Sequence, residues 1–357
     1  QTQQFRELAS LHRFPGGKMR SSGLSLEAIL LKAAIITTIL SSSLVSGFLV
    51  PASASRDKIS TKLQMQSATG FKALSKCSAP TWDSLKSDVL QSETGIQWTE
   101  ELDKRKAGDG MPHTDAKVRL FGTTDEPRVT FYRDTAAWCP YCQKVWIMLE
   151  EKKIPYRVEK INMRSYGDKP DWFLEMVPSG LLPAMKLDGG NVITDSLRIM
   201  GILESEFTDV PMLPEEGDPL RRLAQQLLQK ERELFSWWCQ FTFRPGNGAR
   251  DAFERTLLEV DELLSMRDGP WFLGGDRPSI VDLAYITHIE RMVPSVLYWK
   301  GYRVRGSGMF PNIERWLRAF ELRPSYMATK SDYYTHVMDI PPQYGPGFSV
   351  KEAAPYA

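Results

Sequence analysis

The sequence predicts a small α/β domain followed by an all-helical domain, with a long N-terminal segment of different composition in front. Between residues 127 and 207, short β-rich runs surround an amphipathic helix. From residue 220 onward, apolar residues recur at helical spacing. The length of 357 residues is sufficient for about two ordinary domains with extensions.

The charge of the chain is divided unevenly along its length. Up to Ser78 there are ten Lys and Arg against three Asp and Glu, which leaves 35 against 41 in the remainder. An apolar content of 42% is typical of a globular protein. The mildly acidic body gives no reason to expect a nucleic acid as partner.

The basic front end, residues 1–78, is interpreted as a targeting presequence. After Met19, an apolar stretch from Ala33 to Val45 precedes small residues, which indicates a signal peptide rather than a membrane span. Residues 48–78 are rich in Ser, Thr and basic residues, as transit peptides are. Together the two parts resemble plastid presequences of algae, so we expect a plastid protein, with the secretory pathway as the alternative. No later apolar run is long enough to span a bilayer.

Residues 79–126 are read as an N-terminal extension that packs on the body. Trp82, Leu85 and Val89 have helical spacing, and Trp98 is a candidate for a second contact. The extension has no assigned chemistry.

The α/β domain is predicted over residues 127–207. Asp188-Gly-Gly-Asn191 is a strong hairpin signal between two short β-rich runs. The expected elements are strands at 128–132, 156–161, 184–187 and 192–194, and helices at 139–153 and 195–207. This order, strand-helix-strand and later a hairpin and a helix, is that of a thioredoxin-like domain.

Cys139 begins the first helix of this domain, in a Cys-Pro-Tyr-Cys turn. A helix N-terminus favours the thiolate form of a cysteine, because the macrodipole and unpaired N–H groups face it. Pro140 suits the first helical turn because it gives up an N–H that has no helical partner. Cys142 lies one turn further on the same side, where it can form a disulfide with Cys139 or stay buried.

The number and spacing of cysteines limit the other interpretations of this turn. Four cysteines are too few for a disulfide-stapled secreted domain of this length, which indicates a thiol-reducing compartment. A zinc half-site, a structural disulfide and a chance pair are the alternatives. Zinc needs further ligands. Because Cys77 and Cys239 are isolated and the histidines (His12, His113, His288, His336) are scattered, no metal is expected.

The second half begins after a proline-rich linker at 208–219 and extends over residues 220–332. Its first helix, Leu220 to Phe243, ends in a cluster of aromatic residues. Ser279 and Asp282 have capping-box spacing before an apolar helix. Residues 333–357 contain several prolines and glycines and are predicted to be an irregular tail.

Three segments resemble the glutathione transferase superfamily, specifically its cysteine-type members such as the omega and lambda classes and the dehydroascorbate reductases. The segments are residues 132–146 around the Cys-Pro-Tyr-Cys turn, residues 177–184 with the pair Asp195-Ser196, and residues 271–282. The resemblance covers roughly residues 127–330. It implies a thioredoxin-like domain followed by the all-α C-terminal domain of glutathione transferases.

The resemblance also implies roles for individual residues. Cys139 would be the catalytic thiol, with Cys142 able to resolve its disulfide, and Pro140 and Tyr141 would flank glutathione. Pro183 would be cis, with the backbone of Leu182 pairing with glutathione; the alternative is a proline that starts an edge strand. Asp195 and Ser196 would bind the γ-glutamyl group, although Asp195 also suits a simple N-cap. The aromatic residues Trp237, Trp238 and Phe241 line the acceptor site or belong to the core or a dimer contact.

The expected function is therefore glutathione-dependent thiol transfer, in which Cys139 forms a mixed disulfide with glutathione. Glutathione is the co-substrate, and a small disulfide, dehydroascorbate or a glutathionylated protein is the acceptor; a homodimer is compatible with the family. Two alternatives stay open. One is a non-catalytic binding subunit, and the other is a glutaredoxin-like iron–sulfur cluster protein with glutathione as a ligand.

Overall fold

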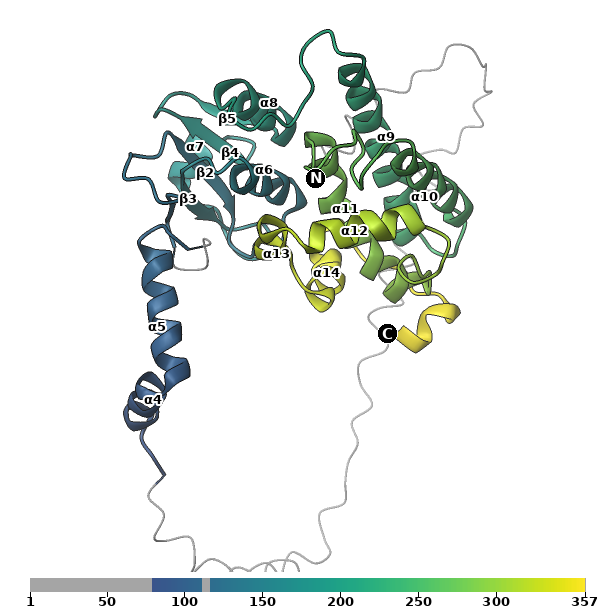
Figure 1. Cartoon of the computed structure of the whole chain (residues 1–357). Coiled ribbons are helices and arrows are strands. Elements are labelled where there is room, and N and C mark those ends of the chain that lie inside the picture. The colour runs from purple at the N-terminus through teal and green to yellow at the C-terminus, as the bar shows by residue number, and fades with distance from the viewer. Residues whose placement is uncertain (1–78, 111–115, 357) are drawn as a thin grey trace, which may run out of the picture. The chain divides into compact units, whose positions relative to one another are not determined.

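A computed structural model describes residues 79–110 and 116–356 of the chain. The predicted presequence, residues 1–78, lies outside these ranges together with Cys77, and so does His113. The described residues form a mixed sheet with helices, followed by an all-helical half (Figure 1). The predicted succession of an α/β domain and an all-helical domain is confirmed.

The α/β domain has one five-stranded sheet in the order β1-β3-β2-β4-β5. Strands β2 and β3 are parallel because α6 forms the crossover between them, and all other neighbours are antiparallel. The strands are β1 (Val118–Arg119), β2 (Val129–Asp134), β3 (Tyr156–Ile161), β4 (Ala184–Leu187) and β5 (Val192–Thr194). The helices are α6 (Pro140–Glu151), α7 (Asp171–Met176) and α8 (Ser196–Glu206).

The two faces of the sheet have separate hydrophobic clusters. Side chains alternate along a strand, so neighbouring residues point to opposite faces. Phe131 of β2 belongs to the large core cluster that includes the apolar residues of α6, whereas Tyr132 packs with Phe173 of α7. Helices α6 and α7 therefore cover opposite faces of the sheet.

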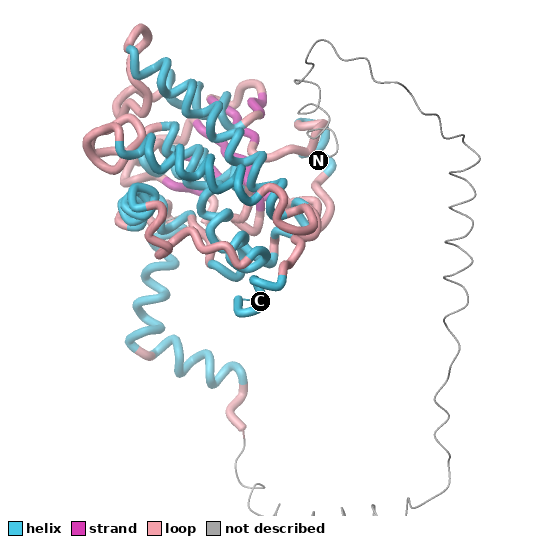
Figure 2. The backbone as a smooth tube through the Cα atoms, turned by 90° about the vertical axis from the view of Figure 1, so that its right-hand side faces the viewer, coloured by secondary structure: helices cyan, strands magenta, loops and turns pink. Residues whose placement is uncertain are grey.

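The helical half is built around α11 (Ile280–Lys300), which is buried along most of its length. Asp282 accepts a hydrogen bond from the backbone N–H of Ser279 at 2.8 Å, which confirms the predicted capping box. Figure 2 views this half from its outer side, with its long helices in front of the strands. The other helices are α9 (Pro219–Thr242), α10 (Arg250–Ser265), α12 (Pro311–Glu321) and α13 (Pro324–Thr329).

The extension before the α/β domain differs from the prediction. The helix expected from the spacing of Trp82, Leu85 and Val89 forms as α4 (Trp82–Gln91) and is followed by a second helix, α5 (Glu93–Lys106), but the only buried residue of the two is Gly95. Trp82 is 87% exposed and Trp98 is 64% exposed, so neither anchors the extension to the body. The contact with the body comes instead from β1, which pairs with β3 and has too few residues to show a periodic pattern.

The C-terminal tail is ordered, and the prediction of an irregular segment was wrong. It forms α14 (Tyr333–Met338), α15 (Ile340–Tyr344) and the 3₁₀ helix η1 (Lys351–Tyr356). Two of the residues that indicated irregularity serve as helix boundaries: Pro341 lies in the first turn of α15, and Gly345 follows its end with a φ of 111°. None of the helices in the two described ranges has the length and apolar character needed to cross a bilayer.

Candidate active site

The strand register brings three predicted site segments to one end of the sheet. Tyr132 in β2 pairs with Ala184 at the start of β4, and Ala184 pairs with Thr194 at the end of β5. The residues that follow Tyr132, precede Ala184 and follow Thr194 therefore lie at the same edge. These are the Cys-Pro-Tyr-Cys turn, Leu182-Pro183 and Asp195-Ser196, as a single binding site requires.

Cys139 is the N-cap residue of α6, with Pro140 in the first turn as predicted. Its side chain makes no capping hydrogen bond, so the sulfur atom does not bind the backbone N–H groups of α6. Cys139 is 7% exposed and is not in a disulfide. The positive end of the helix dipole faces this position.

Cys142 lies in a different environment from Cys139, one turn further into the helix. It is only 1% exposed and is also a free cysteine. Burial raises the pKa of the Cys142 thiol well above its usual value, and the neighbouring groups of Cys139 and Asp134 raise it further. Cys142 is therefore a protonated thiol at neutral pH.

Asp134, at the end of β2, is a member of the site that the sequence analysis missed. Its Oδ2 atom accepts hydrogen bonds from the backbone N–H of Trp138 at 2.6 Å and of Cys139 at 3.1 Å. The residue is fully buried, and its Oδ1 atom has no partner. A polar residue directly after a buried strand and before the Cys turn was the only sequence signal.

A carboxylate oxygen of Asp134 and the sulfur atoms of Cys139 and Cys142 lie within 4.8 Å of one another. These are three possible ligands for a metal ion, one fewer than a closed structural zinc site uses. The zinc half-site considered from the sequence consisted of the two cysteines, and the structure adds the carboxylate of Asp134 as a third possible ligand.

The other predicted glutathione-binding residues lie at the same edge of the sheet. The Leu182–Pro183 peptide bond is cis, as the resemblance implied, and Pro183 is buried. Asp195 accepts a hydrogen bond from the N–H of Arg198 at 3.0 Å, so it does act as an N-cap of α8. Its backbone φ of 71° lies in a region that residues other than glycine rarely adopt. Strained residues of this kind cluster at functional sites. The cap is compatible with a second role in binding.

Tyr141 faces the helical half. Its ring lies 5.4 Å from the ring of His288 on α11, and the guanidinium of Arg232 on α9 lies 6.0 Å from its centroid. Burial lowers the pKa of His288 to about 3, so this imidazole is neutral. Burial also acts to raise the pKa of Glu231, but His288 and Arg232 outweigh it, and the net pKa lies below its ordinary value. Tyr141 therefore contacts a buried ionic cluster between the two domains.

The three aromatic residues proposed for the acceptor site have different environments. Phe241 is 1% exposed and packs against Phe253 and Tyr302, so it belongs to the core rather than to the site. Trp237 is partly buried against the main core. Trp238 is fully buried, and its indole N–H donates to Ser295 at 2.9 Å.

Tyr344, from the tail, packs against Trp238. Its ring centroid lies 5.7 Å from those of Trp238 and Phe243, and 5.8 Å from that of Trp138, the neighbour of Cys139. The tail therefore forms a wall of the region next to Cys139. No local pattern in the sequence indicates the contact with Trp138, because it joins residues about two hundred positions apart.

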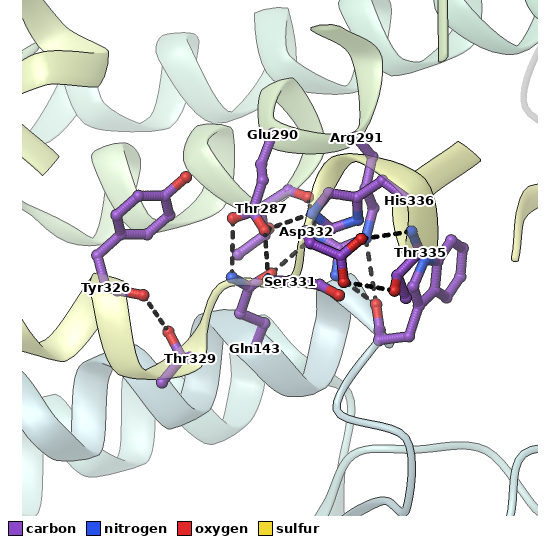
Figure 3. Close-up of polar contacts among 11 residues, drawn as sticks. Gln143, Thr287, Glu290, Arg291, Tyr326, Thr329, Ser331, Asp332, Thr335 and His336 are labelled. Carbon is purple, nitrogen blue, oxygen red and sulfur yellow. Dashed lines mark hydrogen bonds and ion pairs between the residues drawn. The ribbon is translucent and has the colours of Figure 1, made fainter. Parts of the chain in front are cut away.

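A buried polar network connects the tail and α11 to the Cys turn (Figure 3). Arg291 donates to the carbonyl oxygen of Trp138 and to the side-chain oxygen of Gln143 at 2.8 Å. Glu290 accepts from the amide of Gln143 at 2.9 Å and from Nε2 of His336 at 2.6 Å. Burial lowers the pKa of His336, which is therefore neutral and a donor.

Comparison with known proteins identifies the same two domains. The family profile described as glutathione S-transferase, N-terminal domain, matches residues 138–206, and the one for the C-terminal domain matches residues 224–319. Glutathione S-transferase DHAR2 of Arabidopsis thaliana is 31% identical, over 56% of this chain and 86% of the relative. Glutathione S-transferase omega-1 of Mus musculus is 25% identical, over 60% of this chain and 85% of the relative.

A solved structure agrees with the fold. Glutathione transferase Omega 3C from Trametes versicolor matches with a TM-score of 0.50 and 25% identity, covering 60% of this chain and 93% of that one. The two family profiles match within the α/β domain and the helical half. The extension with α4 and α5 precedes the first matched residue, and the tail from α14 follows the last.

Proposed function

Because the chain belongs to the glutathione S-transferase family, we propose that it is a glutathione-dependent thiol oxidoreductase whose reactive group is the thiolate of Cys139. The observation that supports this proposal most directly is the position of Cys139 at the N-terminus of α6. Transferases that conjugate glutathione need a group that stabilises the thiolate of glutathione itself. A cysteine in that position forms a disulfide with glutathione instead, which favours redox chemistry over conjugation.

The reaction proceeds by two thiol–disulfide exchanges. The Cys139 thiolate attacks the glutathione sulfur of a mixed disulfide, the acceptor thiol leaves, and a Cys139–glutathione disulfide forms. The thiolate of a second glutathione then attacks this disulfide, which releases oxidised glutathione and restores Cys139. With dehydroascorbate as acceptor, two glutathione molecules supply the same two electrons.

The edge formed by Leu182, Asp195 and Ser196 is suited to hold glutathione for this attack. The backbone of Leu182 would pair with the cysteinyl part of glutathione. The first N–H groups of α8 and the Ser196 hydroxyl would bind the γ-glutamyl carboxylate, as helix N-termini bind anions. Asp195 would accept from the amino group of the same residue. Leu182 lies shortly before β4, and Asp195 and Ser196 lie directly after β5. Both positions are at the edge of the sheet where β2 leads into the Cys turn.

The decisive experiment is an assay of glutathione-dependent reduction of a mixed disulfide and of dehydroascorbate. We expect Cys139→Ser to lose both activities, because serine cannot form the disulfide. Cys239→Ser is the matched control: Cys239 lies on α9, and burial raises its pKa to about 12, so it stays a thiol. Full activity of Cys139→Ser would refute the proposal.

Two alternative functions predict different results with the same purified proteins. A non-catalytic binding subunit would bind glutathione but show no turnover with either acceptor. An iron–sulfur protein would show visible absorbance after anaerobic purification, lost in the Cys139→Ser protein. The proposed enzyme shows turnover without such absorbance.

A further inference from the structure

The guanidinium of Arg232 is a cation that faces the Cys turn from α9. It lies 6.0 Å from the centroid of the Tyr141 ring and 4.9 Å from that of the Phe235 ring. Tyr141 interacts electrostatically with both Arg232 and Cys139. The Arg232 side chain is 39% exposed, whereas that of Glu231, to which it is paired, is only 3% exposed. Arg232 is therefore a member of the ionic cluster that a bound molecule can reach.

The cluster around Arg232 carries more positive than negative charge. Arg232 donates to both carboxylate oxygens of Glu231 at 2.6 Å. Lys144 of α6 also interacts electrostatically with Glu231 and with Asp195; burial lowers the pKa of Lys144 to about 8, so it is mostly protonated at neutral pH. Because Asp195 is proposed to pair with the amino group of glutathione, two cations share the carboxylate of Glu231. With His288 neutral, one positive charge is left over.

The proposed position of glutathione leaves this side of the Cys turn to the other half of a mixed disulfide. Glutathione would lie along the edge of the α/β domain, and α9 and the tail face the Cys turn from the helical half. Phe235 lies one turn after Arg232 on the same side of α9, and its ring centroid is 6.2 Å from that of Tyr344. These two rings are suited to pack on the carbon atoms of a small thiol, with Arg232 at its charged end.

We infer that Arg232 binds the leaving half of the disulfide and selects acceptors whose thiol carries a carboxylate close to the sulfur. The inference rests on the proposed function and names the class of acceptor for it. A guanidinium suits this role because its planar fork of N–H donors matches the two oxygens of a carboxylate. Arg232 contacts the part of the substrate that leaves, so it determines specificity and does not take part in bond exchange.

Bonds and electrons balance in the exchange. The Cys139 thiolate attacks the glutathione sulfur, the bond between the two substrate sulfurs breaks, and the Cys139–glutathione bond forms. The electron pair of the broken bond goes to the acceptor sulfur, which leaves as a thiolate and takes a proton from water. A fixed positive charge near this sulfur also stabilises the negative charge that develops on it.

The test uses two mixed disulfides of glutathione that differ in charge. One contains β-mercaptopropionate and the other β-mercaptopropionamide, which has nearly the same shape and is neutral. Each kcat/KM of the full chain is divided by the rate constant of the same disulfide with free glutathione, which corrects for intrinsic reactivity. We expect the wild type to prefer the carboxylate about tenfold, as for a hydrogen bond to a charged group. Equal corrected values would overturn the inference.

Substitution of Arg232 tests the assignment to this residue. Arg232→Gln removes the charge and keeps a polar side chain, so the preference should fall to about onefold, through a loss with the carboxylate substrate. Arg232→Lys should keep part of the preference, because it keeps the charge without the planar fork. A preference that stays tenfold in Arg232→Gln would assign the selection to another group and overturn the inference.

Salt provides a readout that needs no substitution. Because Arg232 is partly exposed, added sodium chloride should screen its charge and lower the wild-type preference for the carboxylate. Alkylation of Cys139 by iodoacetamide, a neutral reagent, checks that Arg232→Gln keeps the Cys turn intact. If that rate is altered, the wild-type preference decides the question by itself: a preference that salt leaves unchanged overturns the inference.

Arg221→Gln is the matched control. Arg221 lies about three turns earlier on α9, is also partly buried, and donates to the carbonyl oxygen of Pro214 at 2.9 Å. We expect this variant to keep the wild-type preference for the carboxylate. The same loss of preference in Arg221→Gln and Arg232→Gln would show a general effect of altering α9 and would overturn the inference.

Failure of the inference differs from failure of the proposed function. If the wild type reduces both disulfides with equal corrected kcat/KM, the inference is wrong while the proposed function stands. If the wild type accelerates neither reaction over free glutathione, both are wrong.

Discussion

The guanidinium of Arg291 on α11 donates to the backbone carbonyl oxygen of Trp138, from Nε at 3.1 Å and also from Nη2. Trp138 directly precedes Cys139, so the helical half holds the turn that contains the reactive thiol. Arg291 is 1% exposed, and its remaining donors bind Gln143 and the carbonyl oxygen of Thr287. The position of Cys139 thus depends on contact between the two domains.

Arg291→Met should lower the free energy of unfolding by about 3 kcal/mol, because it leaves a buried carbonyl and a buried amide without their charged donor. It should also slow the reaction of Cys139 with oxidised glutathione, since the turn loses its support. Urea denaturation measures the free energy of unfolding, and mass spectrometry of the glutathione adduct on Cys139 measures the reaction rate. The control is Arg318→Met on α12, whose side chain is 72% exposed; equal stability of both variants would contradict the argument.

Two buried histidines should make the protein less stable in acid. The pKa of His288 is lowered to about 3 and that of His336 is lowered as well, both by burial. The unfolded chain titrates near pH 6.5, so below this pH it binds more protons than the folded protein does. Stability is therefore fully present above pH 6.5 and decreases as the pH falls, by about 2 kcal/mol for His288 at pH 5, and His336 adds a loss of the same sign.

Urea denaturation at pH 7 and pH 5 measures this loss. In the double variant His288→Gln, His336→Gln, these two contributions are absent, so the difference between the two pH values should shrink by their sum. Glu290 does not obscure the comparison: its pKa is lowered, so its contribution is present above pH 4.5 and is lost only below that. An unchanged difference in the double variant would show that other groups cause the acid sensitivity.

Local sequence patterns predicted the elements whose cause is local. Strands 156–161, 184–187 and 192–194 were located correctly because their hairpin and boundary signals lie within the segments themselves. The cis bond before Pro183 and the cap formed by Asp195 followed from motif resemblance and N-cap chemistry.

The missed features depend on partners far away in the chain. Arg291 meets Trp138 across 153 residues, and Glu290 meets His336 across 46. No periodicity encodes which buried polar group will find which partner. The tail was misjudged for the same reason, since its order comes from burying His336 and Ile340 against other helices and not from its own composition. The role of Phe241 was left open between the acceptor site and the core, because apolar spacing does not distinguish a core face from a ligand face.

Asp195 should contribute a charge to glutathione binding in addition to its cap. Asp195→Asn preserves the cap and adds no bulk at the positive φ, because asparagine is an equally good N-cap and has the same shape as aspartate. Stability should change by less than about 0.5 kcal/mol. Loss of a charge-assisted hydrogen bond to the amino group should raise the KM for glutathione about tenfold.

Asp218→Asn is the control for this charge effect. Asp218 is the N-cap of α9 and accepts from the N–H of Leu220 at 2.8 Å, outside the edge where glutathione is proposed to bind. Its substitution should leave the KM for glutathione unchanged. Equal KM values for the two variants would indicate that Asp195 is an N-cap and nothing more.

Tyr344 should limit which acceptors reach Cys139. Its ring packs against both Trp138 and Trp238, and Cys139 itself is only 7% exposed. Tyr344→Ala removes this wall, so the alkylation rate of Cys139 by a bulky maleimide should rise relative to the rate with iodoacetamide. The variant should lose about 2 kcal/mol of stability, as expected for an aromatic ring that leaves an apolar environment.

Tyr334→Ala in the same tail is the control, because Tyr334 is 70% exposed. If the ratio of the two alkylation rates is the same in Tyr344→Ala, Tyr334→Ala and the wild type, the tail does not restrict access and the acceptor must approach Cys139 from another side.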